Sequence, residues 1–429
     1  MNKEILRLAV PNIISNISVP LLSTVDTALM GRLSEWHIGA VGIGSMIFNF
    51  VYWNFGFLRM GTTGLTAQAY GAQDEAAIVH TLGRALFVAL LVAAGLLALQ
   101  WPFGEASFYL MNTAEAQQEL VARYFYIRIW AAPATLGLYA FMGWFFGMQN
   151  AIYPLLLTVL SNVANIALSL FLVRGLGMDV DGVAYGTVGA QYCSLLLAVG
   201  LFYYKYRHLL EHFRRSALLH WQQLRKFLGL NADIFIRTLA LTGAFAFFYS
   251  RSSAEGAMAL AVNTILLQFL NWMSYGVDGF AFASESLVGK YKGAADNLKV
   301  LQAIRLSFGW GLGLAVLFSL GYWFFGEPIL RVFTNQPDVL SAARPFLLWM
   351  AVMPLAGTPC YLWDGVFIGL TASRAMRNSM ILAFVIFLLA YWAALPLGNH
   401  GLWLALLVLL AARGVIQHVL FARKGLELA

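Results

Sequence analysis

Long apolar segments alternate with short polar connections along the whole chain. A helix needs ~20 mostly apolar residues to cross ~30 Å of hydrocarbon. Backbone groups in lipid must bond within the protein, so only helices or closed barrels span a membrane, and these segments are too long and uniform for barrel strands. The pattern predicts an all-α polytopic membrane protein with twelve transmembrane helices, near 8–30, 40–68, 81–101, 124–148, 152–173, 182–204, 232–250, 258–286, 301–325, 343–370, 378–396 and 401–421.

The two halves of the chain repeat one another at a constant offset of 222 residues. Because each half holds six spans, both halves enter the membrane from the same side, as parallel repeats do. We therefore expect two pseudo-symmetric six-helix lobes around a central cleft, 1–204 and 231–429, joined by a basic cytoplasmic connector over 205–230. This architecture is typical of secondary transporters. The recurring positions are Phe103-Gly104-Glu105 with Phe325-Gly326-Glu327, Gly71 and Asp74 with Gly293 and Asp296, and Phe145 and Gly147 with Phe367 and Gly369.

The placement of charge supports the membrane assignment. Only 11% of the residues are charged, against roughly 25% in soluble domains. Most Lys and Arg residues outside the spans fall on the side of the two termini, which predicts a cytoplasmic location for both termini in a plasma membrane, or an inner membrane in a Gram-negative cell. The connector 205–230 is strongly basic, and we expect it to lie on anionic headgroups, with a regulatory site as the alternative.

Several functional classes lack a signal in the sequence. The net charge of +7 is spread over short loops rather than gathered on a nucleic-acid-binding module. No Walker A motif is present, so the sequence does not indicate an ATP-driven pump. The two cysteines, Cys193 and Cys360, lie in apolar runs and are interpreted as packing residues. We expect no enzyme activity, catalytic residue, metal site, cofactor or nucleic-acid partner.

Asp26 is the first ionisable residue that falls deep inside a predicted span. No basic residue lies within a helical turn of it. Burial disfavours the charged form of such a carboxylate, which suits a site that loads and releases H⁺ or Na⁺. A structural hydrogen bond to a neighbouring helix is the alternative.

The fifth and sixth spans carry uncharged polar residues. Asn162 and Asn165 lie in the fifth span and Thr187 in the sixth, and Ser169 shares a helix face with Asn165. Taken alone, these residues are typical of interhelical hydrogen bonding, worth ~0.6 kcal/mol each on average.

The second half carries three acids within its spans. Asp278 and Glu285 share a face of the eighth span, and Asp364 lies midway along the tenth. If Arg237 or Arg413 pairs with them, they are structural or gating elements. If they are unpaired, they face a wet cavity and attract cations.

Four segments now point to a family. The chain resembles the multidrug and toxic compound extrusion (MATE) transporters over its whole length, and is most similar to their DinF-type branch. The last two segments are the most specific, because they contain the three second-half acids. The segments are VDTALMGRL at 25–33, GTTGLTAQAYGAQD at 61–74, YGVDGFAFASESLVGKYKGAAD at 275–296 and CYLWDGVFIGLTASRAMRNSM at 360–380.

The resemblance implies efflux of organic, often cationic, compounds in exchange for H⁺ or Na⁺ by alternating access. It implies that Asp26 carries the coupling ion and that Asn165, Thr187 and Tyr124 belong to its network. We expect Asn162 to be an ion-coupling residue as well. The family often has an aspartate where this chain has Ser169. A Na⁺ site needs several oxygens with enough negative charge, so this departure favours H⁺.

Other functions compete with drug efflux. A lipid or lipid-linked oligosaccharide flippase of the wider superfamily is the main alternative, and the scarcity of central Arg or Lys in the first lobe argues against it. A channel or receptor would show no proton flux with substrate. We expect a monomer whose partners are H⁺, small organic substrates and the lipid bilayer.

Overall fold

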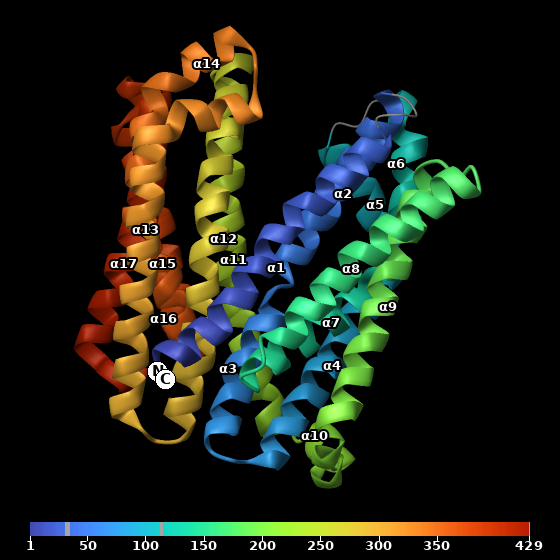
Figure 1. The fold of residues 1–429 in the computed structure, drawn as a ribbon, viewed down its shortest axis with the longest axis vertical. Coiled ribbons are helices and arrows are strands. Elements are labelled where there is room, and N and C mark those ends of the chain that lie inside the picture. Colours follow the sequence, from blue (N-terminus) through green and yellow to red (C-terminus); the bar gives the residue numbers. More distant parts are fainter. Residues whose placement is uncertain (31–34, 112–114, 429) are drawn as a thin grey trace. The chain divides into compact units, whose positions relative to one another are not determined.

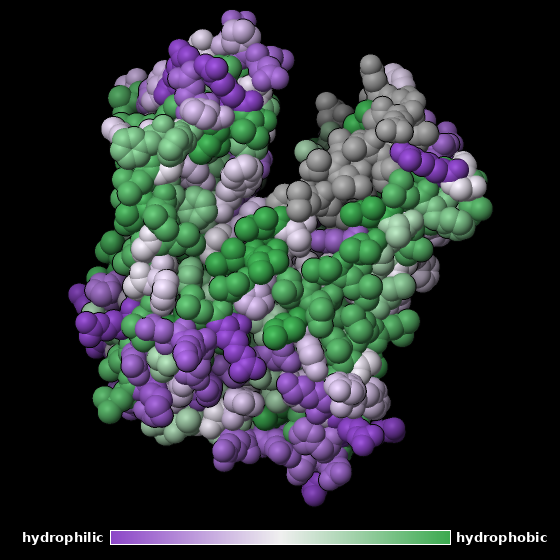
Figure 2. Space-filling model, in the orientation of Figure 1, coloured by the Kyte–Doolittle hydropathy of each residue, from purple (hydrophilic) through white to green (hydrophobic). Residues whose placement is uncertain are grey.

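The computed structural model describes residues 1–30, 35–111 and 115–428, without the side chains of 19–30, 35, 115, 116 and 428. Within these ranges the regular elements are all helices. Eleven helical segments among them are long and apolar enough to span a membrane. With α1 (Asn2–Met30) they make up the twelve predicted spans. Figure 2 shows hydrophobic residues along the helix flanks and hydrophilic residues gathered at helix ends.

The chain divides into two compact units (Figure 1). One unit consists of 14–227, and the other consists of 1–13 together with 228–429. The units differ from the expected halves at α1, which contributes its first turns to the unit built from the second half. The physical reason is a set of contacts from these turns to α12, described below.

The unit 14–227 contains a span that is not a single straight helix. The expected span 40–68 is divided at Phe55 and Gly56. There the Gly56 N–H donates to the carbonyl of Trp53, three residues back, instead of to the carbonyl four residues back as in a regular α-helix. Glycine is a poor helix former, which favours this break. The elements are α2 (Glu35–Asn54), α3 (Phe57–Gly71), α4 (Glu75–Ala98), α5 (Gln100–Leu110), α6 (Glu115–Arg128), α7 (Ala132–Gly147), α8 (Ile152–Leu170), α9 (Val180–Tyr206) and α10 (Arg215–Leu218).

The other unit is built from long helices. Its helices α12 and α15 pack closely, because Gly365 has no side chain. A Cβ atom at this position would overlap the carbonyl oxygen of Ala281. Its elements are α11 (Trp221–Ala254), which begins within the predicted connector, α12 (Ala257–Gly293), α13 (Asn297–Phe333), α14 (Pro337–Ala343), α15 (Leu347–Gly369), α16 (Ser373–Ala393) and α17 (Asn399–Lys424).

The 222-residue repeat is visible in backbone detail. Asp74 caps α4 by accepting from the Ala77 N–H at 2.8 Å, and Asp296 caps α13 by accepting from the Lys299 N–H at 3.0 Å. The residues just before these caps, Gln73 and Ala295, both have positive φ, at 56° and 54°.

A second pair of equivalent positions sets helix packing. A Cβ at Gly143 would overlap the Arg59 carbonyl oxygen, just as one at Gly365 would overlap that of Ala281. Gly143 and Gly365 are 222 residues apart, as are Arg59 and Ala281. The same close helix crossing is therefore built twice.

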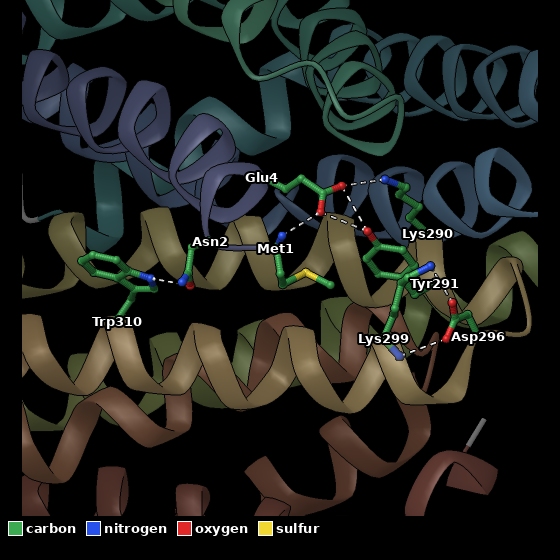
Figure 3. Close-up of polar contacts among 8 residues, drawn as sticks. All are labelled: Met1, Asn2, Glu4, Lys290, Tyr291, Asp296, Lys299 and Trp310. Atoms are coloured by element: carbon green, nitrogen blue, oxygen red, sulfur yellow. Dashed lines mark hydrogen bonds and ion pairs between the residues drawn. The ribbon is translucent and has the colours of Figure 1, made fainter.

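Both termini are bound at one end of α12 (Figures 1 and 3). Glu4 accepts a hydrogen bond from the Lys290 ammonium at 2.9 Å and from the Tyr291 hydroxyl at 3.0 Å. Lys292 donates to the Leu426 carbonyl at 2.8 Å. On the next turns of α1, Ala9 and Ile13 pack against Gly279 of α12.

The connector is held against α4. Arg84 donates to the Ala217 carbonyl at 2.9 Å, and the His80 ring accepts from the Arg214 N–H at 3.1 Å. Most of the connector's basic side chains remain exposed, including Arg215 and Arg225.

Candidate functional site

The first turns of α1 within the unit 14–227 lie along α8. The Ser15 hydroxyl donates to the Thr158 hydroxyl at 2.9 Å, and the Asn162 amide donates to the Ser18 hydroxyl at 3.1 Å. Asn162 therefore joins two helices. Asp26, which follows on α1, lies outside the residues whose side chains the structure describes.

Asn165 and Thr187 are in direct contact. The Asn165 amide donates to the Thr187 hydroxyl at 2.8 Å, and that hydroxyl donates to the Val183 carbonyl at 2.9 Å. Asn165 is 1% exposed and Ser169 is fully buried. Within the described part of the chain, the Asn165 Oδ1 and Ser169 Oγ atoms have no hydrogen-bond partner. The α8–α9 contact thus holds two oxygen atoms ready for a further donor or cation.

Tyr124 lies on α6 and faces α2. Its hydroxyl is 3.3 Å from the Ser45 hydroxyl, and its ring fills the space beside Gly44. Its hydroxyl is also close enough to that of Tyr52 for an electrostatic interaction. The recorded contacts of Tyr124 therefore connect it to α2.

Arg128 is the residue that the sequence analysis undervalued. The expected span 124–148 contains it, yet it was not among the predicted site residues; the structure places it inside the span 117–147, with 9% exposure. Its guanidinium lies over the rings of Phe48 and Tyr52, 5.3 and 5.6 Å from their centroids. The first lobe therefore contains a buried arginine, so the scarcity of central basic residues counts less against a flippase. The position of Arg128 within the expected span 124–148 is compatible with burial but does not specify it.

Asp364 is the centre of a buried charged cluster in the other unit. Arg237 of α11 and Arg413 of α17 both form ion pairs with its carboxylate. The Gln417 amide donates to the same carboxylate at 2.7 Å. All four residues are at most 7% exposed. The alternative of a paired acid therefore holds for Asp364. Gln417 was missed, although it follows Arg413 by one helical turn.

The two acids of α12 lie near this cluster and near α15. Asp278 is close enough to Arg237 for a Coulomb interaction. Glu285 is 1% exposed, and its backbone carbonyl lies against Gly369. Asp278 thus adds negative charge beside two guanidinium groups that share one carboxylate.

The described residues contain no group of three His, Cys, Asp or Glu side chains arranged to hold a metal ion. The cysteines are unpaired: Cys360 is buried and Cys193 is exposed.

Comparison with known proteins identifies the family. The sequence profile of the MatE family matches residues 11–171 and 234–393, which are corresponding parts of the two repeats. The chain belongs to the MatE family. Members of this family are multidrug and toxic compound efflux transporters of the membrane rather than enzymes.

Curated MatE relatives extend over nearly the whole chain. DNA damage-inducible protein F of Escherichia coli (strain K12) is 38% identical, over 98% of this chain and 92% of its own length. Protein DETOXIFICATION 44, chloroplastic, of Arabidopsis thaliana is 28% identical, over 96% and 80%. A probable multidrug resistance protein NorM of Thermotoga maritima is 25% identical, over 80% and 75%.

Solved MatE structures share the fold. A MATE transporter crystallised in a bent conformation superposes with a TM-score of 0.86 at 19% identity, over 99% of this chain and 95% of that one. A multidrug resistance MATE family transporter in an outward-facing conformation gives 0.85 at 18% identity, over 98% and 95%.

Proposed function

We propose that this protein is a secondary active transporter that expels organic, often cationic, compounds in exchange for H⁺ by alternating access. Asp26 carries the proton, and Asn165 and Thr187 form its immediate network. The two repeats supply the lobes that rock around a central cleft. Coupling requires that H⁺ and substrate favour different states, because a ligand with equal affinity for both shifts nothing.

The observation that carries this proposal is the Asn165 Oδ1 atom, which has no hydrogen-bond partner among the residues that the structure describes. It is a buried acceptor next to the Asn165–Thr187 hydrogen bond. A protonated carboxyl group can donate to such an acceptor, whereas a carboxylate cannot. A carboxyl group beside the Asn165 Oδ1 atom would therefore form this hydrogen bond when protonated and lose it when ionised.

The contacts of α1 support Asp26 as that acid. Ser15 and Ser18 meet Thr158 and Asn162, so α1 and α8 run in the same direction along this stretch. Position 26 follows Ser18 by eight residues and Ser169 follows Asn162 by seven. Two helices that continue side by side reach these positions at a similar depth.

The described oxygens near Asn165 favour H⁺ over Na⁺. Asn165, Ser169 and Thr187 supply only neutral oxygens, and Na⁺ is a hard cation that prefers several oxygens with net negative charge. The names of the relatives support drug efflux over lipid flipping, because the Thermotoga protein is described as a probable multidrug resistance protein.

We place both termini in the cytoplasm of a plasma-membrane monomer. The basic loops support this orientation. The contacts of Lys290 and Lys292 with the two ends of the chain support a common side for the termini.

The decisive experiment measures substrate-evoked ion flux in proteoliposomes under separate pH and Na⁺ gradients. We expect a pH gradient alone to drive efflux of a zwitterionic dye, which carries both a cationic group and a carboxylate, and Asp26→Asn to abolish that efflux. Asp338→Asn is the matched control, because Asp338 is exposed on α14. Efflux and proton release at the normal rate in Asp26→Asn would refute the proposal.

A further inference from the structure

Arg128 is a buried basic residue of α6. Among the described side chains, no carboxylate forms an ion pair with it, and its Nη1 atom has no hydrogen-bond partner. An ionised group inside a membrane protein is costly unless it is paired. The Phe48 and Tyr52 rings offset only part of this cost. A cation over an aromatic face is stabilised by about 0.5–2 kcal/mol, which is less than the cost of burying an unpaired charge.

Two further polar atoms beside Arg128 are also unsatisfied. The Tyr52 hydroxyl lies close to the Thr135 hydroxyl and to the Arg128 guanidinium. Both hydroxyls are buried and lack a hydrogen-bond partner of good geometry in the described part of the chain. Buried polar groups are nearly always satisfied, so three such atoms in one place indicate a missing ligand.

The chemistry of these groups specifies the ligand. A guanidinium and two hydroxyls can all donate hydrogen bonds, and a planar guanidinium fork matches the two oxygens of a carboxylate. Arg59 of α3 interacts electrostatically with Tyr139, as Arg128 does. The aromatic rings of Phe48, Tyr52 and Phe125 would contact an apolar body attached to the anion.

We propose that Arg128, Tyr52 and Thr135 bind the anionic group, a carboxylate, of a transported organic compound. The cluster joins α2, α6 and α7 within one unit. Because Arg128 is 9% exposed, the compound reaches it when these helices separate during transport. This inference rests on the proposed efflux function and narrows its substrates to compounds that carry an acid group, zwitterions included.

Binding of a matched pair of probes to the purified full-length protein tests the inference. 1-Naphthoate and 1-naphthamide share an aromatic body and differ in charge. We expect naphthoate to bind at least about tenfold more tightly than naphthamide, since hydrogen bonds to charged groups are the stronger ones. Equal affinities would overturn the inference. Stabilisation by inorganic phosphate alone that matches naphthoate would also overturn it, because the site would then hold a free ion.

Variants localise the effect. Arg128→Met should remove the preference for naphthoate, whereas Arg123→Met should keep it, because Arg123 is an exposed arginine on the same helix. Without ligand, Arg128→Met should melt no lower than the wild type, because an apolar side chain replaces an unpaired buried charge. If that variant does not fold, Tyr52→Phe and Thr135→Val should each weaken naphthoate binding severalfold and leave naphthamide unchanged. Unchanged naphthoate binding in these two variants would contradict the inference.

Two comparisons separate this inference from its alternatives. If Asp26→Asn restores naphthoate binding to Arg128→Met, the guanidinium is a partner of Asp26 and the inference fails. If naphthoate binds with the expected preference but a pH gradient moves neither probe, the proposed function fails and the binding site stands. If a pH gradient drives both probes equally, efflux stands and the site fails.

Discussion

Glu4, in the first turn of α1, accepts a hydrogen bond at 2.9 Å from Lys290, which lies 286 residues away near the end of α12 (Figure 3). The amino terminus of Met1 lies 3.4 Å from the same carboxylate, and Tyr291 donates to it. The first turns of α1 therefore belong to the unit that contains α12, while later turns belong to 14–227. α1 thus contributes residues to both units.

The anchoring of Glu4 should depend on pH. Burial acts to raise the pKa of Glu4, but the hydrogen bonds from Lys290 and Tyr291 outweigh it and hold the pKa below its ordinary value of 4.5. A depressed carboxyl pKa stabilises the folded state above the unfolded pKa, and this stabilisation is lost as the pH falls through the folded pKa. Glu4 is 39% exposed, so the contribution is at most about 1 kcal/mol.

Melting curves of wild type and Glu4→Gln at a series of pH values check this expectation. At neutral pH the variant should melt about 2 °C lower. The difference should shrink as the pH falls below 4.5. A difference that stays constant down to pH values of about 3 would show that the Glu4 carboxylate is not the stabilising group.

Removal of the Asp364 charge should be severely destabilising. Asp364→Asn leaves the Arg237 and Arg413 guanidinium groups buried without their shared carboxylate. Breaking a buried ion pair in this way costs about 3–5 kcal/mol. The loss of monodisperse protein on heating, followed by size-exclusion chromatography, measures the effect. Asp338→Asn is the exposed control.

A triple replacement separates a structural role of this cluster from a gating role. Asp364→Leu with Arg237→Met and Arg413→Met removes all three charges, and apolar replacement of a buried ionic cluster is often neutral or stabilising. If the cluster only stabilises the fold, the triple variant should melt near the wild type and transport normally. If it is a gate, the variant should be stable but inactive. Normal stability of Asp364→Asn would contradict both views.

The sequence predicted the fold well because its signals are local or repeated. Span length follows from the bilayer thickness, and the 222-residue offset predicts equivalent positions such as Asp74 and Asp296. The family resemblance named Asn165 and Thr187 as candidates, but their mutual contact was not predicted, since polar residues on two helices do not reveal which of their faces meet.

Two features could not be predicted because they depend on tertiary packing. The attachment of Glu4 to Lys290 joins residues from opposite ends of the chain, and no pattern in either segment specifies the other. The burial of Arg128 follows from the contacts of α6 with α2 and α7, whereas its sequence position suits the outer end of a span equally well. The 222-residue repeat also gave no indication of a buried arginine, because Met350 stands at the position equivalent to Arg128.

The repeated glycine crossings should respond alike to a methyl group. Gly143→Ala and Gly365→Ala would each force a side chain into a backbone carbonyl of the facing helix. Overpacking of this kind costs about 1–3 kcal/mol. Gly313→Ala is the control, because no heavy atom lies within 4 Å of a Cβ there, and alanine favours helix by up to about 1 kcal/mol.

Thermal melting of the three glycine variants in detergent provides the measurement. Both crossing variants should melt below the wild type, and Gly313→Ala should melt at or above it. If Gly143→Ala alone were destabilising, the close crossing would not be equivalent in the two repeats.

Replacement of the Thr187 hydroxyl should weaken proton coupling more than stability. Thr187→Val keeps the side-chain shape but removes the oxygen that accepts from Asn165 and donates to Val183. The Asn165 amide then loses its fixed orientation, so its free Oδ1 atom no longer faces a constant direction. A neutral hydrogen bond is worth about 0.5–1.5 kcal/mol, so the initial rate of proton-driven efflux should fall by about two- to tenfold. Thr187→Ser retains the hydroxyl and should transport near the wild-type rate. Initial rates of proton flux in proteoliposomes distinguish the two variants, and equal rates for Thr187→Val and wild type would exclude this hydroxyl from the coupling network.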